Sequence, residues 1–289
     1  MKAINYRFLQ YLIFIFLLVN ATGCSQIVSS AKQEFSEDLA ATILEFDDPE
    51  TIKKAVPSYL VLVSSMIKGD PENAGLLKAG AQLYSAYAGG FTDSPESKLA
   101  LSRRAFDYAG RAMCLRNEDF CTAEKQPFDE YSNHLANVPI EQVEYLFVFA
   151  TSWAGLIEAN SADWNAVADL PKVRVAIERV LELDEGINNG NAHLYMAVLD
   201  SLLPPALGGK PELAKEHFER AIALSHGSNL MAKVLYAEKY ARLLFDRELH
   251  DELLREVLAA DVGDGDQVLV NTLAKQKAAV LLADADDYF

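Results

Sequence analysis

The spacing of apolar residues is the feature that most limits how this chain can fold. Apolar residues recur every three or four positions over most of its length, whereas alternating β-branched runs bounded by turn residues are scarce. The stretch that shows this best places six apolar residues on one helix face: Val143, Leu146, Phe147, Ala150, Ala154 and Ile157. The pattern predicts an all-α protein.

Turn-forming residues divide these periodic stretches into separate helices. Gly, Pro, Asn and Asp gather at 68–71, 89–95, 188–191, 204–211 and 263–265. Asp48-Pro49-Glu50 and Asp70-Pro71-Glu72 each put a capping acid before a proline suited to the first helical position. We therefore expect about ten to twelve helices, two of which begin at these prolines.

Three short segments resemble one another and suggest a repeat. Each begins with a basic residue and ends with leucine, and they lie at 111–115, 179–183 and 220–224. In the last copy, Ala214, Phe218 and Ala221 match the second helix of a tetratricopeptide (TPR) repeat, but the copies are irregularly spaced, unlike a regular array of about 34 residues. We expect a degenerate, TPR-like helical-hairpin array, an α-solenoid whose concave surface could accept a ligand or a partner. Its longest irregular stretch is Asn117 to Pro139, whose role stays open.

The N-terminus has the features of an export signal. Lys2 and Arg7 precede an apolar run from Phe8 to Val19, which is too short to span a bilayer. Ala21-Thr22-Gly23-Cys24 resembles a lipobox, although Ala21 stands where such motifs usually have leucine. The alternative, an ordinary secretory signal with a chance cysteine, lacks an A-x-A cleavage site.

These features predict a lipoprotein divided into three parts. Residues 1–23 would be the signal peptide, residues 24–45 the lipidated N-terminus and lead-in helix, and residues 46–289 the repeat domain. Acylated Cys24 would anchor the chain in the periplasm, and Ser25 after it favours the outer membrane. No later stretch suggests a membrane span.

Charge and motifs limit the chemistry that the mature chain can perform. The net charge of −16 disfavours nucleic acid, which binds through Lys and Arg. The histidines form no metal-binding pattern: His134, His193, His217, His226 and His250 are scattered. No phosphate loop or nucleophile turn is present, so we expect no enzyme activity, metal or cofactor.

Four further segments stand out along the chain: Pro57–Leu62, Leu77–Phe91, Leu203–Gly209 with Ala214 and Phe218 after it, and a tail from Asn271 through Leu281-Leu282 to Phe289. Together, and in family order, they resemble a known family, the T component of tripartite ATP-independent periplasmic (TRAP) transporters. The resemblance implies a helical-repeat periplasmic lipoprotein, a homo-oligomer such as a trimer. It also implies pairing with the substrate-binding P component and transfer of a small apolar or organic-acid ligand. Residues 117–137 match no family motif.

Five aromatic residues are candidates for lining a ligand passage. They are Tyr84, Tyr87, Phe91, Trp153 and Tyr195. The competing interpretation is that these rings fill the core between helices. A second function also stays open, a peptide-binding scaffold for envelope assembly, because a solenoid surface would serve it equally.

The two remaining cysteines, Cys114 and Cys121, are candidates for a disulfide in an oxidising periplasm. On one continuous helix their Cα atoms would lie roughly 10 Å apart along the axis, beyond disulfide reach. A bridge therefore requires the helix to end between them, and Asn117-Glu118-Asp119 offers a break. We expect a local disulfide; the alternative is two free thiols.

The lipid anchor gives the first testable prediction. Replacing Cys24 with serine removes the thiol that is acylated, so Cys24→Ser should release the protein into the soluble periplasm or leave its precursor unprocessed. Membrane fractionation of cells that express the variant measures this. An unchanged membrane fraction would contradict the assignment.

Overall fold

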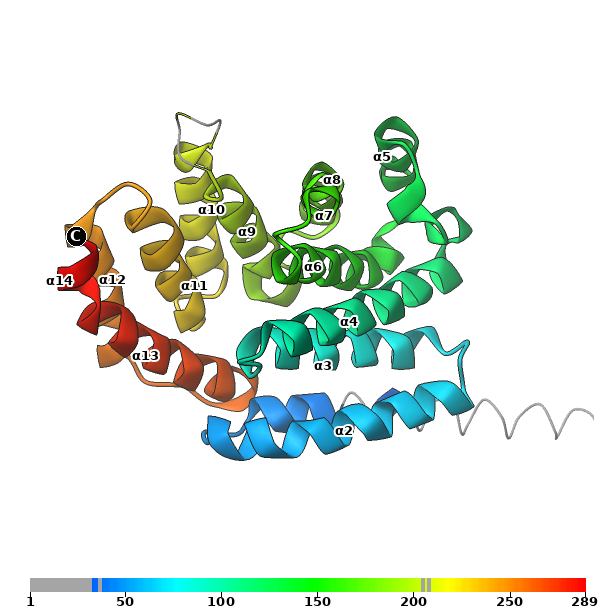
Figure 1. Ribbon diagram of the computed structural model, residues 1–289, viewed down its shortest axis with the longest axis horizontal. Coiled ribbons are helices and arrows are strands. Elements are labelled where there is room, and N and C mark those ends of the chain that lie inside the picture. Colours follow the sequence, from blue (N-terminus) through cyan, green and yellow to red (C-terminus); the bar gives the residue numbers. More distant parts are fainter. Residues whose placement is uncertain (1–32, 36–37, 204–205, 207–208) are drawn as a thin grey trace, which may run out of the picture.

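The computed structural model describes residues 33–35, 38–203, 206 and 209–289, and within them the chain is helical with no strand (Figure 1). The signal peptide and Cys24 lie outside these residues, as do four of the five residues of Pro204–Gly208. In chain order the helices are α2 (Pro49–Gly69), α3 (Ala74–Gly90), α4 (Pro95–Arg116), α5 (Phe128–Ala136), α6 (Val143–Ala159), α7 (Trp164–Val167), α8 (Leu170–Leu183), α9 (Ile187–Asp200), α10 (Pro211–Leu224), α11 (Leu230–Leu235), α12 (Arg247–Ala259), α13 (Val268–Ala283) and α14 (Ala285–Tyr288). Shorter turns are η1 (Glu118–Phe120), η2 (Ala123–Lys125), η3 (Ile140–Gln142), the π-helical η5 (Tyr236–Ala241) and η6 (Gly265–Gln267). The expected all-α class is confirmed, and the number of long helices agrees with the expectation.

One of the two predicted helix starts is confirmed and the other is wrong. The Asp48 carboxylate accepts a hydrogen bond from the Glu50 N–H, and Pro49 is the first residue of α2. Asp70, however, ends α2, with its N–H donating to the Ile67 carbonyl. Helix α3 is capped instead by Asn73, whose side chain accepts from the Leu76 N–H at 2.9 Å.

Neighbouring helices pack against one another in sequence order, and the array then closes on itself. Helix α3 packs on α4, α4 on α6, α6 on α8, and α9 on α10, while α13 packs on α11 and α12 and also reaches α2 (Figure 1). A Cβ atom placed on Gly90 of α3 would lie 3.9 Å from the Leu273 side chain of α13. The last long helix therefore meets the first described ones.

The repeated segments occupy equivalent places in this array. The segments at 111–115, 179–183 and 220–224 form the last turns of α4, α8 and α10. Their second residues, Ala112, Val180 and Ala221, are all buried. The resemblance seen in the sequence thus reflects a shared need for a small or branched residue where each helix end contacts its neighbour.

Two predicted breaks have different outcomes. Asn188, Asn189 and Gly190 all have positive φ, so the expected break lies near the start of α9. The stretch from Asn117 to Pro139 is not irregular throughout, because it contains α5 and two short 3₁₀ turns. Tyr131 and Leu135 of α5 lie four residues apart on one buried face, and this packing stabilises a helix too short to be obvious from periodicity.

Helix α4 ends between the two cysteines, as a disulfide would require. It stops at Arg116, and Asn117 caps the short turn η1 that follows. The sulfurs of Cys114 and Cys121 are bonded, with their Cα atoms 4.5 Å apart. The bridge fixes the chain reversal that leads into α5.

A cluster of titratable side chains ties α9 to α10. His193 Nδ1 lies 2.7 Å from His217 Nδ1, and His193 Nε2 lies 3.1 Å from the Glu185 carboxylate. Arg220 donates two hydrogen bonds to Glu185 and, as the main cause, lowers the pKa of that carboxyl to about 2. Ionised Glu185 therefore accepts from His193 Nε2–H, which leaves His193 Nδ1 to accept from His217.

This cluster predicts a loss of stability in mild acid. Burial lowers the pKa of His193 and of His217, so each takes up its proton at a lower pH in the folded protein than in the unfolded chain, whose histidines titrate near about 6.5. The free energy of unfolding should therefore decrease from about pH 7.5 to about pH 5.5. Urea unfolding measured across this range should show that the free energy of unfolding depends less on pH in His217→Asn than in the native protein. His226→Asn, at an exposed residue with positive φ that asparagine tolerates, is the matched control and should keep the full dependence; equal slopes for the two variants would contradict this.

Candidate functional site

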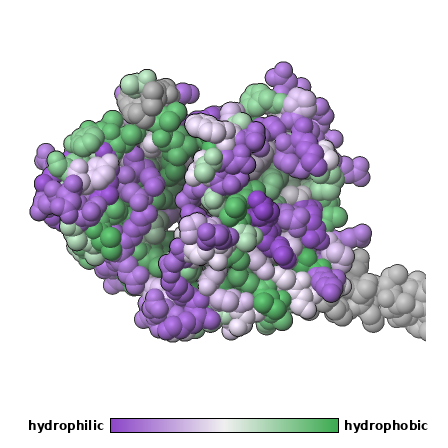
Figure 2. Space-filling view, viewed as in Figure 1, coloured by the Kyte–Doolittle hydropathy of each residue, from purple (hydrophilic) through white to green (hydrophobic). Residues whose placement is uncertain are grey.

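The molecular surface is indented between two lobes. In the view of Figure 2 the indentation separates the part built by α10 to α13 from the part built by α3 to α8. The described residues also form two separate hydrophobic cores, one that includes Phe218 and Leu254 and one that includes Phe149 and Trp153, and α13 contributes to both.

Tyr87 and Phe91 lie together where the array closes. Their rings stack 5.9 Å apart at the end of α3, and both are only partly buried. The Tyr87 hydroxyl donates to the Lys53 carbonyl of α2 at 3.1 Å. Leu273 of α13 packs against the same hydrophobic core as Tyr87 and Phe91. Two of the five candidate aromatics therefore mark the meeting of α2, α3 and α13.

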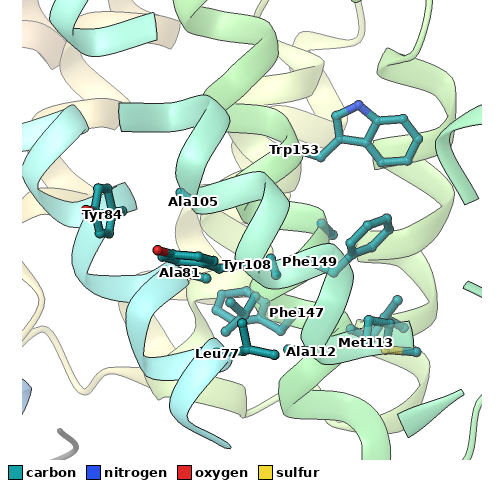
Figure 3. Packing of buried hydrophobic residues seen from close by; sticks show 14 of the residues in the cluster. Leu77, Ala81, Tyr84, Ala105, Tyr108, Ala112, Met113, Phe147, Phe149 and Trp153 are labelled. Carbon is teal, nitrogen blue, oxygen red and sulfur yellow. The ribbon is translucent and has the colours of Figure 1, made fainter. Parts of the chain in front are cut away.

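Tyr84 lies deeper and belongs to a chain of hydroxyl groups. Its side chain is 8% exposed and its ring meets that of Tyr108 edge to face at 5.7 Å (Figure 3). Tyr108 donates to Ser64 Oγ at 3.1 Å, Ser64 Oγ lies 2.8 Å from the Tyr84 hydroxyl, and Tyr84 donates to the Leu60 carbonyl. This chain satisfies three buried or half-buried hydroxyls between α2, α3 and α4.

The other two candidate aromatics lie elsewhere. Trp153 is 2% exposed and packs against Phe106, Phe149 and Tyr131 in the interior (Figure 3). Tyr195 of α9 meets Phe147 of α6 edge to face at 6.0 Å, and burial raises the pKa of its phenol. The structure therefore brings together Tyr87 and Phe91, with Tyr84 one turn away, but not all five.

The sequence interpretation missed a basic groove between α2 and α4. It has a volume of about 620 Å³, and its lining includes Lys68, Arg104, Asp107, Tyr108 and Arg111. Arg104 and Arg111 both stand over the ring of Tyr108, with their guanidinium carbons 5.9 and 5.8 Å from its centre. The sequence contains a pattern that indicates this groove, because Arg104, Tyr108 and Arg111 are spaced four and three residues apart and so share a helix face.

The remaining chemistry of the described residues is sparse. Among them, no group of three or more His, Cys, Asp or Glu side chains is arranged to hold a metal ion. None of the helices in this part of the chain is both long enough and apolar enough to cross a bilayer.

The aromatic placements predict unequal costs of truncation. Tyr84→Ala removes a buried ring and its hydrogen bonds, and should lower the free energy of unfolding by about 3 to 5 kcal/mol. Tyr87→Ala removes a ring that already contacts solvent, so its cost should stay below about 2 kcal/mol. Chemical unfolding of both variants measures the difference, and equal costs would show that Tyr87 is as much a core residue as Tyr84.

Comparison with known proteins identifies the family. No curated protein matches the chain. The family model described as TRAP transporter T-component matches residues 45–289, which is most of the chain and includes α2 to α14. The chain therefore belongs to the T-component family of TRAP transporters and has an accessory role in such a transporter.

Proposed function

We propose that this protein binds the substrate-binding P component of its TRAP system in the periplasm and conveys a small apolar or organic-acid ligand. The observation that carries the proposal is the family match over residues 45–289. The division of the molecule into two lobes with an indentation between them supports it, because such a surface can receive a partner and a ligand together.

The proposed ligand passage lies at the place where the array closes, which is where α13 meets α2 and α3; we call this place the seam. Tyr87 and Phe91 lie at the seam with their rings partly exposed. Tyr84 is buried one turn away and would shape the wall from behind. Trp153 and Tyr195 pack elsewhere, against Phe149 and Phe147, and are not part of this wall. A mostly apolar wall with few polar groups suits a ligand that loses its hydration on entry.

Membrane attachment and self-association complete the proposal. Acylated Cys24 would hold the protein at the outer membrane, and the mature part would form a homo-oligomer, a trimer in the simplest case. Its role would be to bind and transfer without catalysis. The alternative of a peptide-binding scaffold for envelope assembly gains no support from the family match, whereas the transport role does.

The proposed function predicts selective capture of a binding protein. Affinity purification of the native protein from its own cells should recover a periplasmic solute-binding protein, identified by mass spectrometry. Tyr87→Ala combined with Phe91→Ala should reduce the recovered amount at least about fivefold if the seam carries the interaction, since central aromatic residues dominate interface energies.

A matched aromatic control separates this effect from general damage. Trp164 is 85% exposed on α7, which is distant from Tyr87 and Phe91 in the sequence and is drawn near α6 and α8 in Figure 1. Trp164→Ala should therefore leave the recovery unchanged. If the native protein recovers no solute-binding protein, the transport proposal fails.

A further inference from the structure

The groove between α2 and α4 carries a positive charge on an acidic protein. Its lining has three cations, Lys68, Arg104 and Arg111, and one acid, Asp107, whereas the whole chain has a net charge of −16. Within the part of the chain that the structure describes, Asp107 forms an ion pair only with Arg111, at 3.6 Å. Neither Arg104 nor Lys68 has an acidic partner within 4.0 Å among the described residues, so the groove has cationic groups available to an anion.

The groove is held in shape by packing beneath it. Tyr108 is 4% exposed, and its ring supports both guanidinium groups while its hydroxyl accepts from Arg104. Arg111 also donates to the Pro71 carbonyl at 3.2 Å, which fixes it at the corner between α2 and α3. Two arginines that are already oriented lose less side-chain freedom when an anion binds.

One rim of the groove is apolar and exposed. Val61 of α2 lines the groove with 70% of its surface exposed, and Leu62, the next residue of α2 but outside the groove lining, is 40% exposed. Basic residues next to exposed aliphatic side chains are typical of surfaces that lie on anionic membranes, where the charges meet headgroups and the apolar side chains reach below them.

The described chain begins at the same corner. A side chain on Gly75 would collide with Gln33, so Gln33 lies against the start of α3, four residues after Pro71. Gln33 is nine residues after Cys24, and a chain of that length spans at most about 30 Å. A lipid on Cys24 would therefore keep the corner, and the groove beside it, close to the membrane surface.

We propose that the α2–α4 groove docks on the membrane by binding the phosphate of an anionic phospholipid headgroup. This inference rests on acylation of Cys24 but not on capture of a solute-binding protein, so the two proposals fail separately. Docking would fix the orientation of an acidic protein that the anionic membrane otherwise repels, with α2 facing the lipid.

The test uses the acylated full protein on vesicles and an arginine-selective dicarbonyl reagent, with modified peptides quantified by mass spectrometry. On vesicles that contain phosphatidylglycerol, Arg104 should be modified about fivefold more slowly than on pure phosphatidylcholine. Arg103, the exposed neighbour of Arg104 outside the groove lining, is the internal control and should react at the same rate on both.

Two variants and one further arm make the outcome decisive. Lys68→Gln should reduce the protection of Arg104, and Asp107→Asn should increase it, because the first removes a cation and the second removes the one acid in the lining. Equal modification of Arg104 on both vesicles, or equal protection of Arg103, would overturn the proposal. Protection of Arg104 on phosphatidylcholine by inorganic phosphate alone would also overturn it, since that result would identify a site for a free anion.

Discussion

The close packing around Gly80 is the contact on which the N-terminal half of the structure depends. Helix α3 is covered by α2, α4 and α6, and at its centre a Cβ on Gly80 would lie 2.8 Å from Ile67 and 3.2 Å from Tyr108. Because glycine has no side chain, α2 and α4 can approach the same point of α3 from two sides. Glycine within a helix costs roughly 0.5 to 1 kcal/mol relative to alanine, and the packing it permits offsets that cost. Tyr108, seated against Gly80, then supports both the hydroxyl chain to Tyr84 and the two arginines of the basic groove.

Charged side chains show how an acidic chain can leave a few cations available. Many of its lysines and arginines are paired with acids across helices, as in Lys78 with Glu144 and Lys98 with Glu158. Such exposed pairs contribute little stability individually, but they neutralise the cations that form them. Arg174 is a stronger case, because it meets the buried carboxylate of Asp200 at 2.7 Å, where an unpaired charge would be costly. Against this background, Lys68 and Arg104 differ from most of the cations around them.

Local sequence patterns predicted the helices well, but they did not predict the contacts between residues that are distant in the chain. Apolar periodicity and the Asp48 cap act within a few residues, and both gave correct results. The wrong start at Asp70 arose because two capping residues lie three positions apart, and the choice of Asn73 depends on where α2 ends. Of the candidate aromatics, Tyr87 and Phe91 were close in sequence and remain together, but the surroundings of Trp153 and Tyr195 are set by helices far away in the chain. The groove was missed for the same reason, since its two walls come from different helices.

The meeting of α13 with α2 also has a consequence for the order of folding. About 200 residues separate the end of α2 from the start of α13, whereas α3, α4 and α6 meet near neighbours in the chain. Joining distant segments requires the largest loss of chain entropy, so we expect this junction to form last and to open first. Local opening there would leave the helix pairs on either side intact. The junction between α13 and α2 is thus the least stable contact of the closed array. A partner that binds across this junction would change how often it opens.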